Sequence, residues 1–122
     1  MTLSIIHIFA VALGGAIGAS LRYYLSSLFG SHGILVINIL GCFALGMLVS
    51  LFALKISVSQ TTNLFLTVGI LGGFTTFSSF SMEAMHMIDT HKYIQAVVYI
   101  TASVGGGLIA FILGRYLVKT II

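Results

Sequence analysis

The chain has 122 residues, of which 59% are hydrophobic and only 6% are charged, and its formal net charge is +3 at pH 7. Soluble domains carry about a quarter charged residues, so a soluble fold of this composition would have almost nothing to present to water. The composition excludes the soluble classes and predicts an integral membrane protein with a single domain, residues 1–122.

Four apolar stretches contain no Asp, Glu, Lys or Arg: residues 1–21, 33–54, 62–82 and 93–114. Each is near the ~20 residues that a helix needs to cross the hydrocarbon core of a bilayer. We therefore predict an all-α fold of four transmembrane helices, with approximate spans 2–28, 33–54, 62–88 and 93–117.

Arg22 is the first charged residue, and it follows the first apolar stretch. A signal peptide has its positive charge before the apolar core, so we expect this stretch to be a retained helix. Arg22 itself has two interpretations: its side chain reaches the lipid headgroups, or it supplies positive potential at the mouth of a pore.

Asn38 is a lone amide deep in the second stretch. An asparagine inside a membrane can join helices through hydrogen bonds, or its NH₂ group can donate to an anion. Polar groups at such depth are candidates for functional sites, so Asn38 is a candidate site residue with both interpretations open.

The third stretch contains the segment GGFTTFSSF, residues 72–80. Gly costs about 1 kcal/mol relative to Ala in a helix, Thr adds a rotamer cost, and the chain has no proline. Broken membrane helices offer carbonyls to cations and N–H groups to anions. We predict a broken third helix with a functional role; the alternative is a kinked, closed helix whose hydroxyls bond to their own preceding turn.

Phe77, Phe80 and Glu83 recur at three-residue spacing after the expected break, so they share one helix face. Phenylalanines in a membrane helix ordinarily face lipid or the core. The edge of an aromatic ring is electropositive, however, so two stacked edges can line an anion path. Ser78 and Ser79 lie beside these rings.

Tyr99 and Ser103 are four residues apart on the fourth stretch and face the same way as Gly107. This face is either a packing seam or a row of hydroxyl donors. Small residues also recur at four-residue spacing in three strips: Gly14 and Gly18, Gly69 and Gly73, and Gly106, Ala110 and Gly114. Such strips let helix backbones approach closely, and three of them favour tight association, including between subunits.

The charges give little information on orientation. With four crossings, both termini share one side with the second connection, and that side carries Lys55, Arg115 and Lys119. The other side carries Arg22 and Lys92, which leaves barely a bias under the positive-inside rule. Either the chain inserts one way for another reason, or it has dual topology, with copies inserted both ways and paired antiparallel.

The sequence shows no sign of an enzyme. Glu83 and Asp89 are the only acids, the four histidines have no metal-ligand spacing, and there is neither a nucleophile–base pair nor a phosphate loop. There is also no basic run of the kind that binds nucleic acid. We expect a non-enzymatic protein of the lipid bilayer.

Three segments together resemble the Fluc (CrcB) family of fluoride ion channels: GGAIGASLRYY (14–24), VINILGCFALG (36–46) and GILGGFTTFSSFS (69–81). The resemblance covers essentially the whole chain. It implies an antiparallel, dual-topology homodimer in the inner (plasma) membrane of the cell, with two separate fluoride pores at the subunit interface. It also implies a central structural Na⁺, held by the backbone carbonyls of Gly72 and Thr75 of both subunits.

The resemblance further assigns a role to each candidate pore residue. Phe77 and Phe80 correspond to the pore phenylalanines, and Asn38 to the amide that handles the anion. The other implied residues are Ser78 and Ser79 on the pore side, Tyr99 and Ser103 as a hydroxyl track, Arg22 of the first helix, and Glu83 near one pore end. Two positions depart from the family pattern: Ser79 replaces a common Thr and keeps a hydroxyl, whereas Gly107 stands where some members have a serine.

The implied function is passive efflux of fluoride, which protects the cell from fluoride toxicity without use of ATP. Fixed donors must replace the water around a small anion, and the amide, the hydroxyls and the ring edges provide them. A small multidrug-type transporter also has four spans and dual topology, but its proton-coupled members need a carboxylate in the first span, and residues 1–21 have none. A non-conducting assembly subunit would leave the break unexplained.

Overall fold

The computed structural model describes residues 3–54 and 56–121, and these are helical except for short connections. In chain order the elements are α1 (Ile5–Phe29), η1 (Gly30–His32), α2 (Gly33–Leu54), α3 (Gln60–Leu64), η2 (Phe65–Leu71), α4 (Gly72–Phe74), α5 (Phe77–Asp89) and α6 (Tyr93–Ile121). Of these, η1 is a short 3-10 helix and η2 is a π-helix. Since no strand occurs among the described residues, the predicted all-α fold is confirmed for them.

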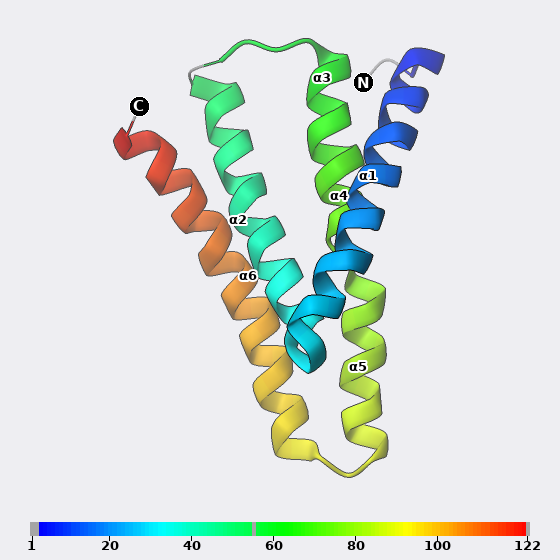
Figure 1. Ribbon diagram of the computed structural model, residues 1–122. Coiled ribbons are helices and arrows are strands. Elements are labelled where there is room, and N and C mark those ends of the chain that lie inside the picture. Colours follow the sequence, from blue (N-terminus) through cyan, green and yellow to red (C-terminus); the bar gives the residue numbers. More distant parts are fainter. Residues whose placement is uncertain (1–2, 55, 122) are drawn as a thin grey trace.

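Three helical runs are long and apolar enough to cross a membrane: Ile5–Leu54, Gln60–Asp89 and Tyr93–Ile121. The first run contains both α1 and α2, and the chain reverses direction between them at η1 (Figure 1). Gly30 allows this reversal because its φ is 63°, a backbone conformation that a glycine adopts at little cost. That α1 and α2 each cross the membrane, giving four spans, stays a prediction.

Figure 1 also shows where the connections lie. The two described chain ends and the connection between α2 and α3 lie at one end of the molecule, and the connection between α5 and α6 lies at the other. This arrangement agrees with the expectation that both termini share one side with the second connection. Lys55, one of the charges used to judge orientation, lies outside the described residues.

Glycines on α1 bring its backbone against the third helical run. A Cβ atom on Gly14 would lie only 2.5 Å from the Phe65 carbonyl oxygen, and one on Gly18 would lie 2.8 Å from the Phe74 nitrogen. On the other side of the contact, a Cβ on Gly73 would lie 2.8 Å from the Gly15 carbonyl oxygen. Two of the predicted strips therefore pack on each other within one chain.

The second close contact joins α2 and α6. A Cβ atom on Gly46 would clash with the Phe111 carbonyl oxygen, and one on Gly114 would lie 3.0 Å from the Met47 nitrogen. The interpretation of the strips as contacts between subunits is therefore wrong for the glycines whose faces the same chain already fills: Gly14, Gly18, Gly69, Gly73 and Gly114.

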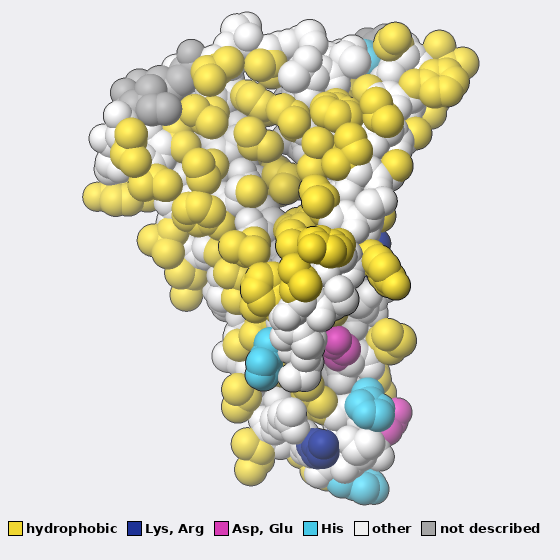
Figure 2. All heavy atoms as spheres, viewed as in Figure 1, with side chains coloured by type: hydrophobic (Ala, Val, Ile, Leu, Met, Phe, Trp, Pro, Cys, Tyr) yellow, Lys and Arg dark blue, Asp and Glu magenta, His cyan; other side chains and the backbone are white. Residues whose placement is uncertain are grey.

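Few large side chains are buried. Ile37 on α2 is 0% exposed, and a small cluster on α5 and α6 contains Phe80, Ala84 and Tyr99. Many other large apolar side chains are exposed. Figure 2 shows them spread over the face in view, with most charged and histidine side chains gathered toward the α5–α6 connection. An apolar surface of this extent suits contact with lipid or another protein more than contact with water.

Candidate functional site

The third helical run is interrupted at Thr75 and Thr76. α4 ends at Phe74, and both threonines have extended backbones, with φ −87° and ψ 157° at Thr75 and φ −150° and ψ 119° at Thr76. The Thr76 Oγ1 then accepts a hydrogen bond from the Ser79 N–H at 3.1 Å, which caps the start of α5. The predicted break is confirmed. It lies at the threonines, while Gly72 and its neighbour remain helical.

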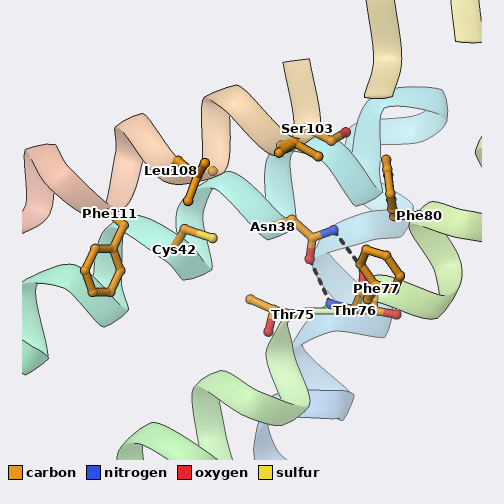
Figure 3. Close-up of a pocket in the computed structure, with 11 residues that line it drawn as sticks. Asn38, Cys42, Thr75, Thr76, Phe77, Phe80, Ser103, Leu108 and Phe111 are labelled. Carbon is orange, nitrogen blue, oxygen red and sulfur yellow. Dashed lines mark hydrogen bonds between the residues drawn. The ribbon is translucent and has the colours of Figure 1, made fainter. Parts of the chain in front are cut away.

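Two side chains from other helices hold the break. On α2, the Asn38 Nδ2 donates to the Thr76 carbonyl oxygen at 2.9 Å, and the Asn38 Oδ1 accepts from the Thr76 N–H at 2.8 Å (Figure 3). On α1, the Arg22 Nε donates to the Gly73 carbonyl oxygen at 3.0 Å. The expectation that Asn38 can join helices through hydrogen bonds is confirmed, whereas the contact of Arg22 with Gly73 was not predicted. The predicted roles of both residues toward an anion stay predictions.

The carbonyls of Gly72 and Thr75 are the predicted cation ligands. The N–H and the Oγ1 of Thr75 both donate to the Leu71 carbonyl oxygen, at 3.0 and 2.9 Å. Among the side-chain and non-helical backbone hydrogen bonds of the described residues, none reaches the carbonyl oxygen of Gly72 or Thr75. Both oxygens therefore have lone pairs to offer to a hard cation, which prefers oxygen ligands of this kind.

An aromatic row extends from α5 to α6. The ring centroids of Phe77 and Phe80 are 5.4 Å apart, and those of Phe80 and Tyr99 are 5.5 Å apart, distances at which tilted rings attract each other. Phe80 and Tyr99 are each 8% exposed, whereas Phe77 is 77% exposed. The row ends at Glu83, whose Oε2 accepts a hydrogen bond from the Tyr99 hydroxyl at 2.5 Å.

A cavity of about 400 Å³ lies beside the break (Figure 3). Its lining brings together five of the predicted site residues: Asn38, Thr75, Phe77, Phe80 and Ser103. The Ser103 Oγ is buried and has no hydrogen-bond partner in the described part of the chain. We call this space the break cavity.

Thr76 and Cys42 also line the break cavity, although neither was predicted as a site residue. The sequence could have indicated Thr76 as a site residue, because it directly follows Thr75 in the same TTF run. Cys42 lies one helical turn after Asn38 and so shares its face. Gly107, the departure from the family pattern, lines the cavity too, and a Cβ there would lie 3.3 Å from the Cys42 Sγ.

A second cavity, of about 420 Å³, lies near the α5–α6 connection, and its lining includes Glu83, His86, Lys92 and Gln95. Because Tyr99 stacks on Phe80 and bonds to Glu83, the aromatic row connects the two cavities. We call this second space the connection cavity.

Five predicted site residues line neither cavity: Arg22, Gly72, Ser78, Ser79 and Tyr99. Ser78 and Thr76 share a hydrogen bond between their hydroxyl oxygens, which are 3.2 Å apart. The backbone of Ser79 takes part in the cap of α5. In this chain these serines support the break, and their role in a pore stays a prediction.

A family model described as "CrcB-like protein, Camphor Resistance (CrcB)" matches residues 9–115. Three curated relatives are each named "Fluoride-specific ion channel FluC". The one from Chloroflexus aurantiacus is 42% identical over 88% of this chain and 91% of its own length. Those from Rhizobium etli and Ruminiclostridium cellulolyticum are 40% and 42% identical over 95% of this chain, and the matches cover 98% and 95% of their lengths. Since the relatives are named as ion channels, the prediction that this protein is not an enzyme is confirmed. The chain belongs to the CrcB family.

Proposed function

We propose that this protein is a fluoride-selective channel that lets fluoride leave the cell passively and so protects the cell from fluoride toxicity. The observation that carries the proposal is the break cavity, where an amide, an unpartnered hydroxyl and two phenylalanine rings meet beside a broken helix. The relatives named as fluoride-specific channels support the choice of ion.

The break cavity offers donors to an anion that has shed its water. The Ser103 hydroxyl has no other partner in the described ranges. The Asn38 amide has two N–H groups, and only one of them is used by Thr76. The electropositive edges of Phe77 and Phe80 add weak attraction without a full charge. This balance suits conduction, because an ion must leave a site as readily as it enters.

The connection cavity provides the other part of the path. Lys92 places a positive charge there, and the carboxylate of Glu83 is partly satisfied by the Tyr99 hydroxyl, which reduces its repulsion of an anion. Fluoride enters a cell as neutral HF, ionises in the more alkaline interior, and leaves through this path down its gradient. No energy source beyond that gradient is needed.

The assembly belongs to the proposal as well: an antiparallel, dual-topology homodimer in the inner membrane, with two pores at the interface between subunits. Two observations support it. Phe77, a pore residue in the proposal, is 77% exposed in the single chain, so a second copy can cover it. The Lys and Arg residues also give barely any bias toward one orientation.

A structural Na⁺ between the two breaks completes the proposed assembly. The carbonyl oxygens of Gly72 and Thr75 would hold it, and they are free of the non-helical backbone and side-chain hydrogen bonds of the described residues. The ion would supply a fixed positive charge, which the negative oxygen ends of these carbonyl dipoles attract, and would thereby join the subunits.

The proposed function predicts fluoride efflux from liposomes that contain the purified protein. Vesicles loaded with potassium fluoride, with valinomycin to balance charge, should release fluoride faster than protein-free vesicles, as measured with a fluoride electrode. Chloride should leave much more slowly, because the break cavity holds an ion by a few close donors. Equal rates for the two ions would remove the selectivity, and a requirement for a proton gradient would indicate a coupled transporter.

Dual topology predicts partial labelling from either side of the membrane. In a Cys42→Ser background, Ser57→Cys places a thiol on the exposed connection before α3, and Asp89→Cys places one at the opposite end of the molecule. A membrane-impermeant maleimide applied to intact cells should label about half of the copies of each variant, because oppositely inserted copies expose opposite ends. Full labelling of one variant and none of the other would show a single orientation.

A further inference from the structure

The backbone N–H and C=O of Thr76 both form their hydrogen bonds with a single side chain. With φ −150° and ψ 119°, its N–H and C=O point to the same side, as in a β-strand. The Asn38 amide bonds to both, at 2.8 and 2.9 Å, and so acts as the neighbouring strand would in a hydrogen-bonded pair. One side chain thus replaces both of the helical hydrogen bonds that Thr76 gives up by leaving the helix.

The approach of α2 to the break is close enough to make this pairing possible. Gly41, three residues after Asn38, faces the same region, and a Cβ atom there would lie 3.4 Å from the Phe74 Cδ2 and would clash with the Thr75 Cγ2. A backbone group left without a partner at membrane depth is costly. The pairing with Asn38 removes that cost for both the backbone N–H and the backbone C=O of Thr76.

The pairing also fixes which way the amide points. A peptide N–H can bond only to the oxygen of the Asn38 amide, and a peptide C=O only to its nitrogen. Asn38 therefore cannot turn over without losing both bonds. Its second N–H is the remaining donor of the amide, and Asn38 lines the break cavity. The group that the Asn38 amide can still offer to an anion is therefore this second N–H, because its oxygen is bonded to Thr76.

We propose that Asn38 is a positioning residue: it holds Thr76 extended and thereby sets the direction in which Phe77 and α5 leave the break. Arg22 acts from α1 on the preceding segment, through the Gly73 carbonyl oxygen. Neither Asn38 nor Arg22 donates to the carbonyl oxygens of Gly72 or Thr75, since their bonds go to Thr76 and Gly73. The pairing itself is independent of the transported ion; only the transport measurement below rests on the proposed function.

The test is hydrogen exchange at the Thr76 amide, followed by NMR on protein labelled with ¹⁵N-threonine in lipid nanodiscs. Asn38→Ala should speed exchange at Thr76 at least about tenfold, equivalent to about 1.4 kcal/mol of lost protection. Asn38→Asp keeps an oxygen to accept the Thr76 N–H, and when its carboxyl is protonated the O–H can donate to the Thr76 carbonyl oxygen in place of the amide. Protection of the Thr76 amide should therefore stay near the wild-type value while this carboxyl is protonated and fall when it ionises, because two oxygens would then face each other. Asn63→Ala is the matched control, since Asn63 is the one other asparagine and is exposed on α3.

Fluoride efflux from liposomes is measured on the same proteins. The proposal expects Asn38→Ala to lose at least about nine-tenths of the efflux, a tenfold change. If Asn38→Ala exchanges like the wild type, or exchanges faster while conducting normally, the positioning role is wrong. Should Asn38→Ala not fold, Asn38→Asp decides the same point, since rapid exchange at Thr76 while the new carboxyl is protonated contradicts the pairing. A wild-type protein that passes no fluoride but shows the expected exchange pattern would overturn the proposed function and leave the pairing supported.

Discussion

Gly18→Ala is expected to prevent the protein from folding into its native packing and to abolish fluoride efflux. The new methyl group would clash with the Ile70 carbonyl oxygen and lie 2.8 Å from the Phe74 nitrogen. Both are backbone atoms, so no side chain can rotate away to make room. Overpacking typically costs about 1–3 kcal/mol and occasionally more, and a methyl group forced against the backbone of the third helical run belongs at the upper end of that range.

The damage should reach the break itself. Arg22 lies one helical turn after Gly18, so any outward shift of α1 weakens its 3.0 Å hydrogen bond to the Gly73 carbonyl oxygen. The thermal midpoint in detergent and the fraction of monodisperse protein measure the folding defect, and liposome efflux measures the functional one.

Gly15→Ala is the matched control for this variant. It makes the same chemical change on the same helix, but a Cβ atom there meets nothing within 4 Å, so its stability and efflux should equal or slightly exceed those of the wild type. Wild-type behaviour of Gly18→Ala would show that α1 does not pack on the third helical run as described.

The composition and the apolar stretches were enough to predict the helical fold. The ends of the third run could be predicted as well, since charged and polar residues flank it. The π-helix η2 was not predicted, and neither was the contact of its Gly69 with Gly14 of α1, which joins residues far apart in the sequence. A glycine strip has no property that tells whether its partner is in the same chain or in another subunit, which is why that part of the interpretation was wrong.

In the candidate site too, features set by local sequence could be predicted, whereas contacts between distant residues could not. The TTF run predicts a break because threonine is poorly suited to a helix and its hydroxyl can cap the next one. The pattern of aromatic residues at three-residue spacing placed Phe77 and Phe80 on one face, and their rings are in tilted contact. The pairing of Asn38 with Thr76 joins residues 38 positions apart. The lone amide indicated that Asn38 could bond to another helix, but local sequence carries no information on which residue it meets. Only the tertiary structure shows that the amide already has a partner.

Phe80→Ile is expected to lower fluoride efflux while leaving the fold intact. Phe80 packs between Phe77 and Tyr99 at centroid distances of 5.4 and 5.5 Å, with the rings tilted, and it lines the break cavity. Isoleucine is apolar and fills much of the same space, so the loss of stability should be modest. It has no electropositive edge, however. An aromatic contact of this kind is worth about 0.5–1.5 kcal/mol, which corresponds to roughly a two- to tenfold change in rate if the anion feels the same attraction.

The control is Phe9→Ile on α1, where the ring is 66% exposed and lies outside both cavities. Fluoride efflux and the thermal midpoint are measured for both variants. Phe80→Ile should lose efflux at a midpoint close to that of the wild type, and Phe9→Ile should change neither quantity. Because Phe80 also supports Tyr99, and through it the hydrogen bond to Glu83, a fall in both quantities would assign the ring to packing. A wild-type rate in Phe80→Ile would mean that the anion does not use the aromatic row, and the path would then have to follow the hydroxyl of Ser103 and the amide of Asn38 alone.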